Sequence, residues 1–175
     1  MMSLVVVNYP GFSEQDFEWI QSVRKQHDPL FFDVIDPHFT MVFPTSNIDE
    51  QTLIEHTRQH ASTFPAFDVV FRCAVVGDPN FMDHAHAFLV PDEGFSNVVR
   101  LHDLLYTGPL ESELRLDLPF TPHVAFANTP TPAKCKAIID EPNAENFEMR
   151  ARVQALDVIR YEGGRVSPVE RVELA

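Results

Sequence analysis

The chain has 175 residues, 45% of them hydrophobic and 15 of them Phe, which is typical of a globular protein with a packed core. Its formal net charge of −13 disfavours binding to a long polyanion, because its 13 Lys and Arg residues are scattered along the sequence. No apolar stretch approaches the roughly 20 residues that a membrane span needs, and the N-terminal segment lacks the features of a secretory signal. We therefore expect a cytoplasmic protein with a small ligand, which binds neither a membrane nor a long nucleic acid.

The first half of the chain alternates predicted strands and helices. Residues 4–8 form an apolar run of strand length, and the helix after them begins with Ser13 as N-cap and Asp16 in the capping-box position. This helix ends at Asp28, which precedes a proline. The next predicted elements are a strand at 39–43, a helix at 49–64 and a strand at 67–76.

The second half continues the same alternation. It contains a predicted strand at 86–90, a helix at 95–106 and a strand at 120–127. A helix then begins at Thr131, with a proline in its first position. The chain ends with an alternating strand at 147–155 and two further strands joined by a Gly-Gly turn. This order predicts an α+β protein, with residues 1–175 forming one domain. We expect two similar, interleaved lobes, each supplying one histidine-bearing strand to a shared cleft.

Cys73 and Cys135 fall in different predicted elements and match no metal-binding spacing. A cytoplasmic protein keeps most of its cysteines reduced, so we expect two buried thiols, with a disulfide as the alternative. Either state is compatible with the predicted fold.

Two segments of the sequence resemble each other. Residues 37–43 and 122–128 each begin with a Pro-His step that leads into an apolar run of strand length. Because strand side chains alternate, His38 shares a face with Thr40, and His123 shares a face with the residue two positions later. Two such strands would bring two imidazoles to one cleft.

A pair of imidazoles in one cleft has a definite chemical use, whereas a single histidine at a strand start is usually structural. One neutral ring accepts a proton from water or a hydroxyl, and the other ring, when protonated, donates to the leaving oxygen. The hydroxyl of Thr40 lies on the same face as His38 and can donate to a phosphoryl oxygen as charge develops there. The repeated motif therefore indicates acid–base catalysis at a phosphate.

These motifs resemble those of the two-histidine (2H) phosphoesterase superfamily, which includes the 2',5' RNA ligase-like proteins and cyclic phosphodiesterases. That family carries two His-x-Thr/Ser motifs on central strands of a bilobal, pseudo-symmetric fold, in which antiparallel sheets form a cleft with helices outside. The first motif matches as His38-Phe39-Thr40. The second motif matches at His123 but departs at Ala125, where the pattern has Thr or Ser.

The resemblance implies hydrolysis of a 2',3'-cyclic or 2',5'-linked phosphodiester in a small nucleotide or an RNA end, with no metal and no cofactor. His123 would act as the base for water and His38 as the acid for the leaving ribose oxygen, or the two roles are exchanged. Thr40 and Ala125 occupy the substrate-binding positions of the two motifs. We expect a monomer.

Ala125 leaves a second interpretation open. A missing hydroxyl forfeits a hydrogen bond to a charged oxygen, which is worth roughly 1.5–3 kcal/mol, or about 10- to 100-fold in rate. Backbone N–H groups or the Thr121 hydroxyl could substitute for it. The alternative is a non-catalytic protein that binds a nucleotide or an RNA end with a degenerate second motif.

A third interpretation is a metal hydrolase. His84 and His86 form a His-x-His step that could hold zinc. No acidic residue or cysteine lies at a recognisable ligand spacing, which favours a place for both histidines at a strand start or along the cleft wall. We therefore predict no metal site.

Overall fold

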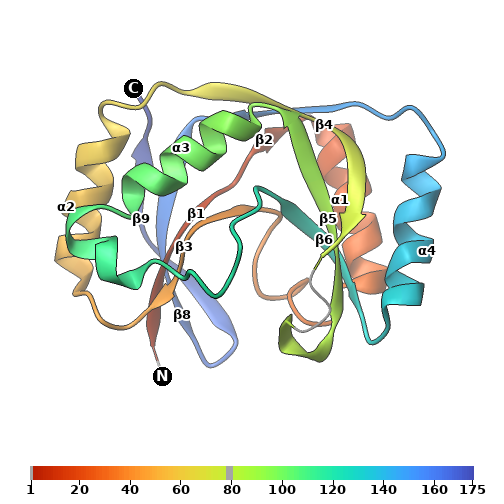
Figure 1. Ribbon diagram of the computed structural model, residues 1–175, viewed down its shortest axis with the longest axis horizontal. Coiled ribbons are helices and arrows are strands. Elements are labelled where there is room, and N and C mark those ends of the chain that lie inside the picture. Colours follow the sequence, from red (N-terminus) through yellow and green to blue (C-terminus); the bar gives the residue numbers. More distant parts are fainter. Residues whose placement is uncertain (1, 78–80) are drawn as a thin grey trace.

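The computed structural model describes residues 2–77 and 81–175, which form two antiparallel sheets flanked by α-helices (Figure 1). The first sheet has the order β3-β1-β8-β9, with β3 at Phe39–Thr45, β1 at Ser3–Asn8, β8 at Ala155–Glu162 and β9 at Arg165–Glu173. The second sheet has the order β2-β7-β4-β5-β6, with β2 at Gly11–Phe12, β7 at Met149–Val153, β4 at Phe67–Val76, β5 at Ala85–Glu93 and β6 at Val124–Thr129. The predicted α+β fold with antiparallel sheets is confirmed.

Each sheet is covered by helices on one face (Figure 1). Helices α2 (Glu50–Ala61) and α3 (Phe95–Leu105) contact strands of the first sheet, while α1 (Glu14–His27) and α4 (Pro132–Asn143) contact the second. Two short 3-10 helices, Phe81–Asp83 and Gly108–Glu113, lie in the connections. No helix in the part of the chain described here is long and apolar enough to span a membrane.

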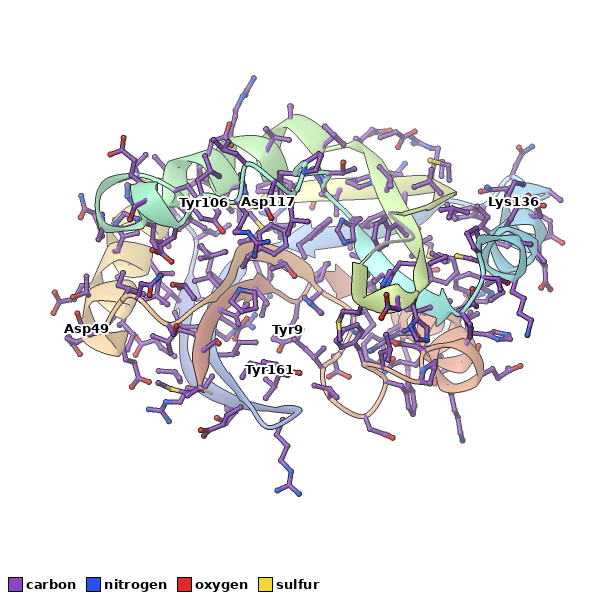
Figure 2. All side chains as sticks on the ribbon, turned by 60° about the horizontal axis from the view of Figure 1, so that its bottom comes forward. Tyr9, Asp49, Tyr106, Asp117, Lys136 and Tyr161 are labelled. Carbon is purple, nitrogen blue, oxygen red and sulfur yellow. The ribbon has the colours of Figure 1, made fainter. Side chains whose placement is uncertain are left out.

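The helices begin where the capping residues predict. The Ser13 hydroxyl accepts a hydrogen bond from the backbone N–H of Asp16 at 3.1 Å, as expected for the N-cap of α1. Asp49, labelled in Figure 2, caps α2 through its carboxylate, and Thr131 caps α4 just before Pro132. These bonds satisfy N–H groups that a helix leaves without a partner in its first turn.

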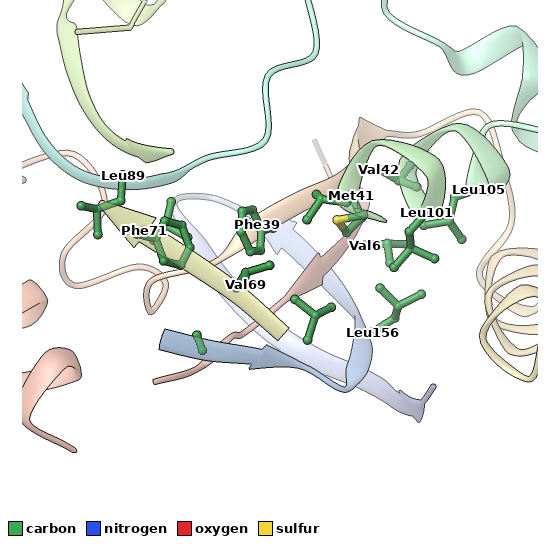
Figure 3. Packing of buried hydrophobic residues seen from close by; sticks show 14 of the residues in the cluster. Val6, Phe39, Met41, Val42, Val69, Phe71, Leu89, Leu101, Leu105 and Leu156 are labelled. Atoms are coloured by element: carbon green, nitrogen blue, oxygen red, sulfur yellow. The ribbon is translucent and has the colours of Figure 1, made fainter. Parts of the chain in front are cut away.

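One apolar core joins the two sheets (Figure 3). Phe39 of β3 stacks on Phe71 of β4, with ring centroids 5.9 Å apart, and Phe12 packs on the same Phe71 at 5.5 Å. Phe39 and Phe71 are both fully buried, and each such side chain contributes about 1.5–3 kcal/mol relative to exposure. This packing holds β3 against the second sheet, and so sets how the two histidine-bearing segments face each other.

Two predictions need correction. The strand of the second motif begins at Val124 and not at residue 120, because Pro119 and Pro122 lack the N–H groups that a strand ladder requires. Both cysteines are free thiols, so the disulfide alternative is wrong, and Cys135 is buried as predicted. Cys73, however, is exposed, because the alternation of β4 places it on the sheet face opposite the buried Ala74.

Candidate active site

The two motif histidines are held by the same local bond. Each lies just before a strand, His38 before β3 and His123 before β6. The His38 Nδ1 atom is 2.8 Å from the Asp36 carbonyl oxygen, and the His123 Nδ1 atom is 2.6 Å from the Thr121 carbonyl oxygen. A carbonyl can only accept, so each Nδ1 carries the proton, and Nε2 of each neutral ring is left as an acceptor.

Both histidines border the edges of their sheets. β3 is an edge strand of the first sheet and β6 is an edge strand of the second. The family resemblance implied central strands, whereas both strands lie at sheet edges in this structure. A small pocket beside the two motifs is lined by Thr40, Thr121 and His123 together with aromatic and proline side chains, Phe39, Phe43, Pro119 and Phe120, and His38 is not among its lining residues.

Burial determines the protonation state of both motif histidines. It is the main cause that lowers the pKa of His38 to about 4, and the positive charges of Arg24 and of protonated His123 contribute to that lowering. Burial likewise lowers the pKa of His123 to about 4, with a contribution from His86. Both rings are therefore neutral near pH 7, although each Nδ1 hydrogen bond favours the charged form.

The two positions that follow the histidines differ in chemistry. Thr40 is half-buried and pairs with Val7 in the first sheet, so its side chain lies on the open face with the pocket. Ala125 is half-buried beside Phe88 of β5, its cross-strand partner, and does not line the pocket. The motif residue Thr40 thus offers a hydroxyl at the pocket, whereas the methyl group of Ala125 lies outside the pocket.

A buried ion pair supports the loop that precedes His38. Arg24 of α1 donates to the Asp28 carboxylate at 2.9 Å and to the carbonyl oxygens of Phe31 and Ile35 at 3.0 and 2.6 Å. Asn128 of β6 donates to the same Asp28 carboxylate. The network therefore ties the loop of the first motif to the strand of the second.

Tyr9 adds a polar wall beside His38. Its ring meets the His38 ring edge-on at 6.3 Å, and it lies with Tyr161 on the open face of the first sheet (Figure 2). Burial and the carboxylates of Asp157 and Asp36 raise the pKa of Tyr9 to about 12, so its hydroxyl stays protonated.

Among the described residues, His84 and His86 belong to no cluster of potential metal ligands. Across the described residues, no group of three or more His, Cys, Asp or Glu side chains could hold a metal ion. His84 makes the same Nδ1 contact as the motif histidines, to the Met82 carbonyl oxygen at 2.9 Å, and His86 is buried near Phe88.

Sequence reasoning missed several residues around the site. Arg24 and Asp28 have i,i+4 helical spacing, which usually marks a weak surface pair, and their burial depends on the loop that folds over them. Phe88 stacks on His123, and no feature of the strand pattern distinguishes it from other Phe residues. Only a contact between distant segments gives these residues a role.

The chain is similar to known proteins over nearly its whole length. The family model for the 2'-5' RNA ligase superfamily matches residues 12–165. Escherichia coli LigT complexed with 3'-AMP has a TM-score of 0.67 and 16% identity, covering 99% of this chain and 98% of that one. Thermus thermophilus TT0787 has a TM-score of 0.64 at 14% identity over 98% and 97% of the two chains. Kluyveromyces marxianus Usb1 has a TM-score of 0.53 at 13% identity over 95% and 96%.

At these identities the solved structures support the fold alone. No curated protein matches the chain.

Proposed function

The chain belongs to the 2'-5' RNA ligase superfamily, and from this premise we propose that it hydrolyses a small 2',3'-cyclic or 2',5'-linked phosphodiester. One observation carries the proposal: the two motifs meet at one pocket, lined by Thr40 of the first and His123 of the second, and each motif histidine has its Nδ1 bonded to the backbone. Structures of E. coli LigT with 3'-AMP and with phosphate fit this choice, since 3'-AMP is a hydrolysis product of 2',3'-cyclic AMP.

In the proposed reaction, His123 Nε2 takes a proton from water as the water oxygen attacks phosphorus. The bond between phosphorus and one ribose oxygen breaks, and protonated His38 gives its proton to that oxygen, or the two histidines exchange roles. The product is a phosphomonoester. The Thr40 hydroxyl donates a hydrogen bond to a non-bridging oxygen, where charge develops in the transition state.

The low pKa of both rings adds a condition to this mechanism. With both histidines neutral near pH 7, the general acid must gain a proton before or as the substrate binds. A phosphodiester anion beside an imidazole raises that ring's pKa, because opposite charges stabilise each other. The substrate therefore helps to create the acid that acts on it.

The charges around the pocket favour a substrate with one negative charge. Arg24 is buried and engaged by Asp28 and two carbonyl groups. Arg115, in the wall of an adjacent pocket, pairs with Asp117 at 2.6 Å. With a net charge of −13 around it, this site suits a cyclic phosphate diester better than a chain of phosphates.

The adjacent pocket suits the nucleoside part of such a substrate. It shares Phe43, Pro119 and Phe120 with the first pocket, and its other lining residues are three leucines, Leu114, Leu116 and Leu118, together with His102, Asp103 and Arg115. Phe120 is backed by the buried His102 ring, with centroids 3.6 Å apart and planes 12° apart. A flat aromatic base would remove its apolar faces from water there.

The test is turnover of 2',3'-cyclic nucleotides, with products identified by phosphorus NMR in the presence and absence of excess chelator. We expect a phosphomonoester product and an unchanged rate in chelator. His38→Ala and His123→Ala should each lower kcat by about 10²- to 10⁴-fold. His84→Ala is the matched control, because His84 makes the same backbone contact but lies outside both motifs.

A second candidate is a binding protein without turnover, which the methyl group at Ala125 favours. Calorimetry with the same cyclic nucleotides separates the two. Binding without hydrolysis would replace the enzyme by the binding protein. If the protein neither binds nor hydrolyses these nucleotides, both candidate functions are wrong. Loss of hydrolysis in chelator would favour the metal hydrolase with His84 and His86.

A further inference from the structure

The His123 ring is covered on one face by an aromatic side chain. Phe88 of β5 stacks on it with ring centroids 3.7 Å apart and planes 23° apart. His38, by contrast, contacts the ring of Tyr9 edge-on, with centroids 6.3 Å apart. The stack and the Nδ1 bond to the Thr121 carbonyl oxygen together restrict the ring's position and its rotation.

Phe88 is held in place by its strand neighbours. It pairs with Ala125 on β6 and with Val75 on β4, so all three side chains lie on one face of the sheet. Ala125 carries only a methyl group next to this ring. Phe88 also lies near the buried His86 ring, with centroids 6.0 Å apart.

Gly77 provides the space that the Phe88 ring occupies. A Cβ atom at Gly77 would lie less than 3.0 Å from three atoms of that ring, closer than real Cβ atoms come to their neighbours. The Gly77 backbone cannot easily retreat, because its N–H donates to the His86 carbonyl oxygen at 2.7 Å. Any side chain at position 77 must therefore push Phe88 aside.

From this chain of contacts we infer that Gly77 and Phe88 are positioning residues that hold the His123 imidazole for phosphodiester hydrolysis. The inference rests on the function proposed above, but its structural half, the control of the His123 ring, can be measured without turnover. Phe88 also excludes water from one face of the ring, which is consistent with the burial that lowers the pKa of His123. The other titratable groups near this ring are His86 and His38.

The kinetic test is a double-mutant cycle. Gly77→Ala and Phe88→Ala should each lower kcat by about 10- to 100-fold with little change in KM, since a displacement of about 1 Å in a reacting group costs this much. In the Phe88→Ala background, Gly77→Ala should cost nothing more, because the added methyl group then meets empty space. Phe17→Ala, at an exposed phenylalanine of α1, is the matched control.

The structural test is NMR of the His123 ring as a function of pH. Phe88→Ala should remove the ring-current shift of the imidazole protons and move the His123 pKa from about 4 towards its ordinary value near 6.5. If Phe88→Ala does not fold, as judged by circular dichroism, Phe88→Leu keeps the apolar volume and removes the flat ring.

Unchanged shifts and pKa in a folded Phe88 variant would overturn the inference. So would a Gly77→Ala cost that persists in the Phe88→Ala background. A wild-type protein without turnover would defeat the proposed function alone, and the NMR result would still decide whether Phe88 positions His123.

Discussion

The surroundings of His38 and His123 start from the same backbone geometry and differ in almost every side chain. Both rings follow a buried proline and bond to a carbonyl oxygen two residues earlier. The His38 ring meets the ring of Tyr9 edge-on, whereas the His123 ring is stacked against Phe88. The backbone therefore sets the same tautomer twice, while the side chains make one half of the site polar and the other apolar.

This asymmetry suggests a division of labour. The His38 half holds the hydroxyl of Thr40, which can stabilise charge on a phosphate oxygen. The His123 half lacks that hydroxyl and holds its ring by packing. The predictions below test whether each half depends on the contacts that distinguish it.

The largest expected effect comes from the Arg24–Asp28 pair on the His38 side. Arg24→Met leaves a buried carboxylate without its cation and should lower the free energy of unfolding by about 3–5 kcal/mol, measured by urea denaturation. Arg58→Ala, in the exposed pair with Glu170, is the control and should cost less than about 1 kcal/mol. Equal costs for the two variants would contradict a structural role for the buried network.

Thr40→Val tests the hydroxyl of the same half with little change in shape. We expect kcat to fall by about 10- to 100-fold, because one hydrogen bond to a charged oxygen is lost. Steady-state kinetics on a 2',3'-cyclic nucleotide would measure it. A fall in affinity alone, with kcat intact, would mean that Thr40 binds the ground state and does not act selectively on the transition state.

Ala125→Thr would make the two halves more alike. If the site is otherwise intact, the restored hydroxyl should raise kcat by about tenfold. Thr121→Val is the companion variant, since a loss there would indicate that the Thr121 hydroxyl, in the pocket wall, already replaces the missing group. Lower activity in Ala125→Thr would indicate a pocket shaped for different chemistry around Phe88.

The pH dependence tests what the two halves share. With both pKa values lowered to about 4, the free protein has one protonated and one neutral ring mainly near that pH. Above it, kcat/KM should fall by about tenfold for each unit of pH. The kcat profile should be shifted towards neutral pH, because the bound anion raises the pKa of the acid. A flat kcat/KM between about pH 5 and 8 would contradict acid–base catalysis by these rings.

Local patterns in the sequence predicted most of the fold. Helix starts at Ser13 and Thr131 were readable because a cap and its helix are neighbours in the chain. The strand of the second motif was placed too early: it was expected to begin at Phe120, but Pro119 and Pro122 interrupt the segment before Val124. The exposure of Cys73 was missed, since sequence alternation does not say which face of β4 is covered.

The sequence by itself determined the two Pro-His motifs and the difference between them, which is Thr40 in the first motif and Ala125 at the corresponding position of the second. Each motif is a short continuous segment, so a local pattern is enough to recognise it. Only the tertiary structure decided the role of Gly77 under Phe88, the burial of Arg24, and the contact of Asn128 with Asp28. These features join segments far apart in the chain, and the packing of the two sheets, which no local pattern encodes, brings them together.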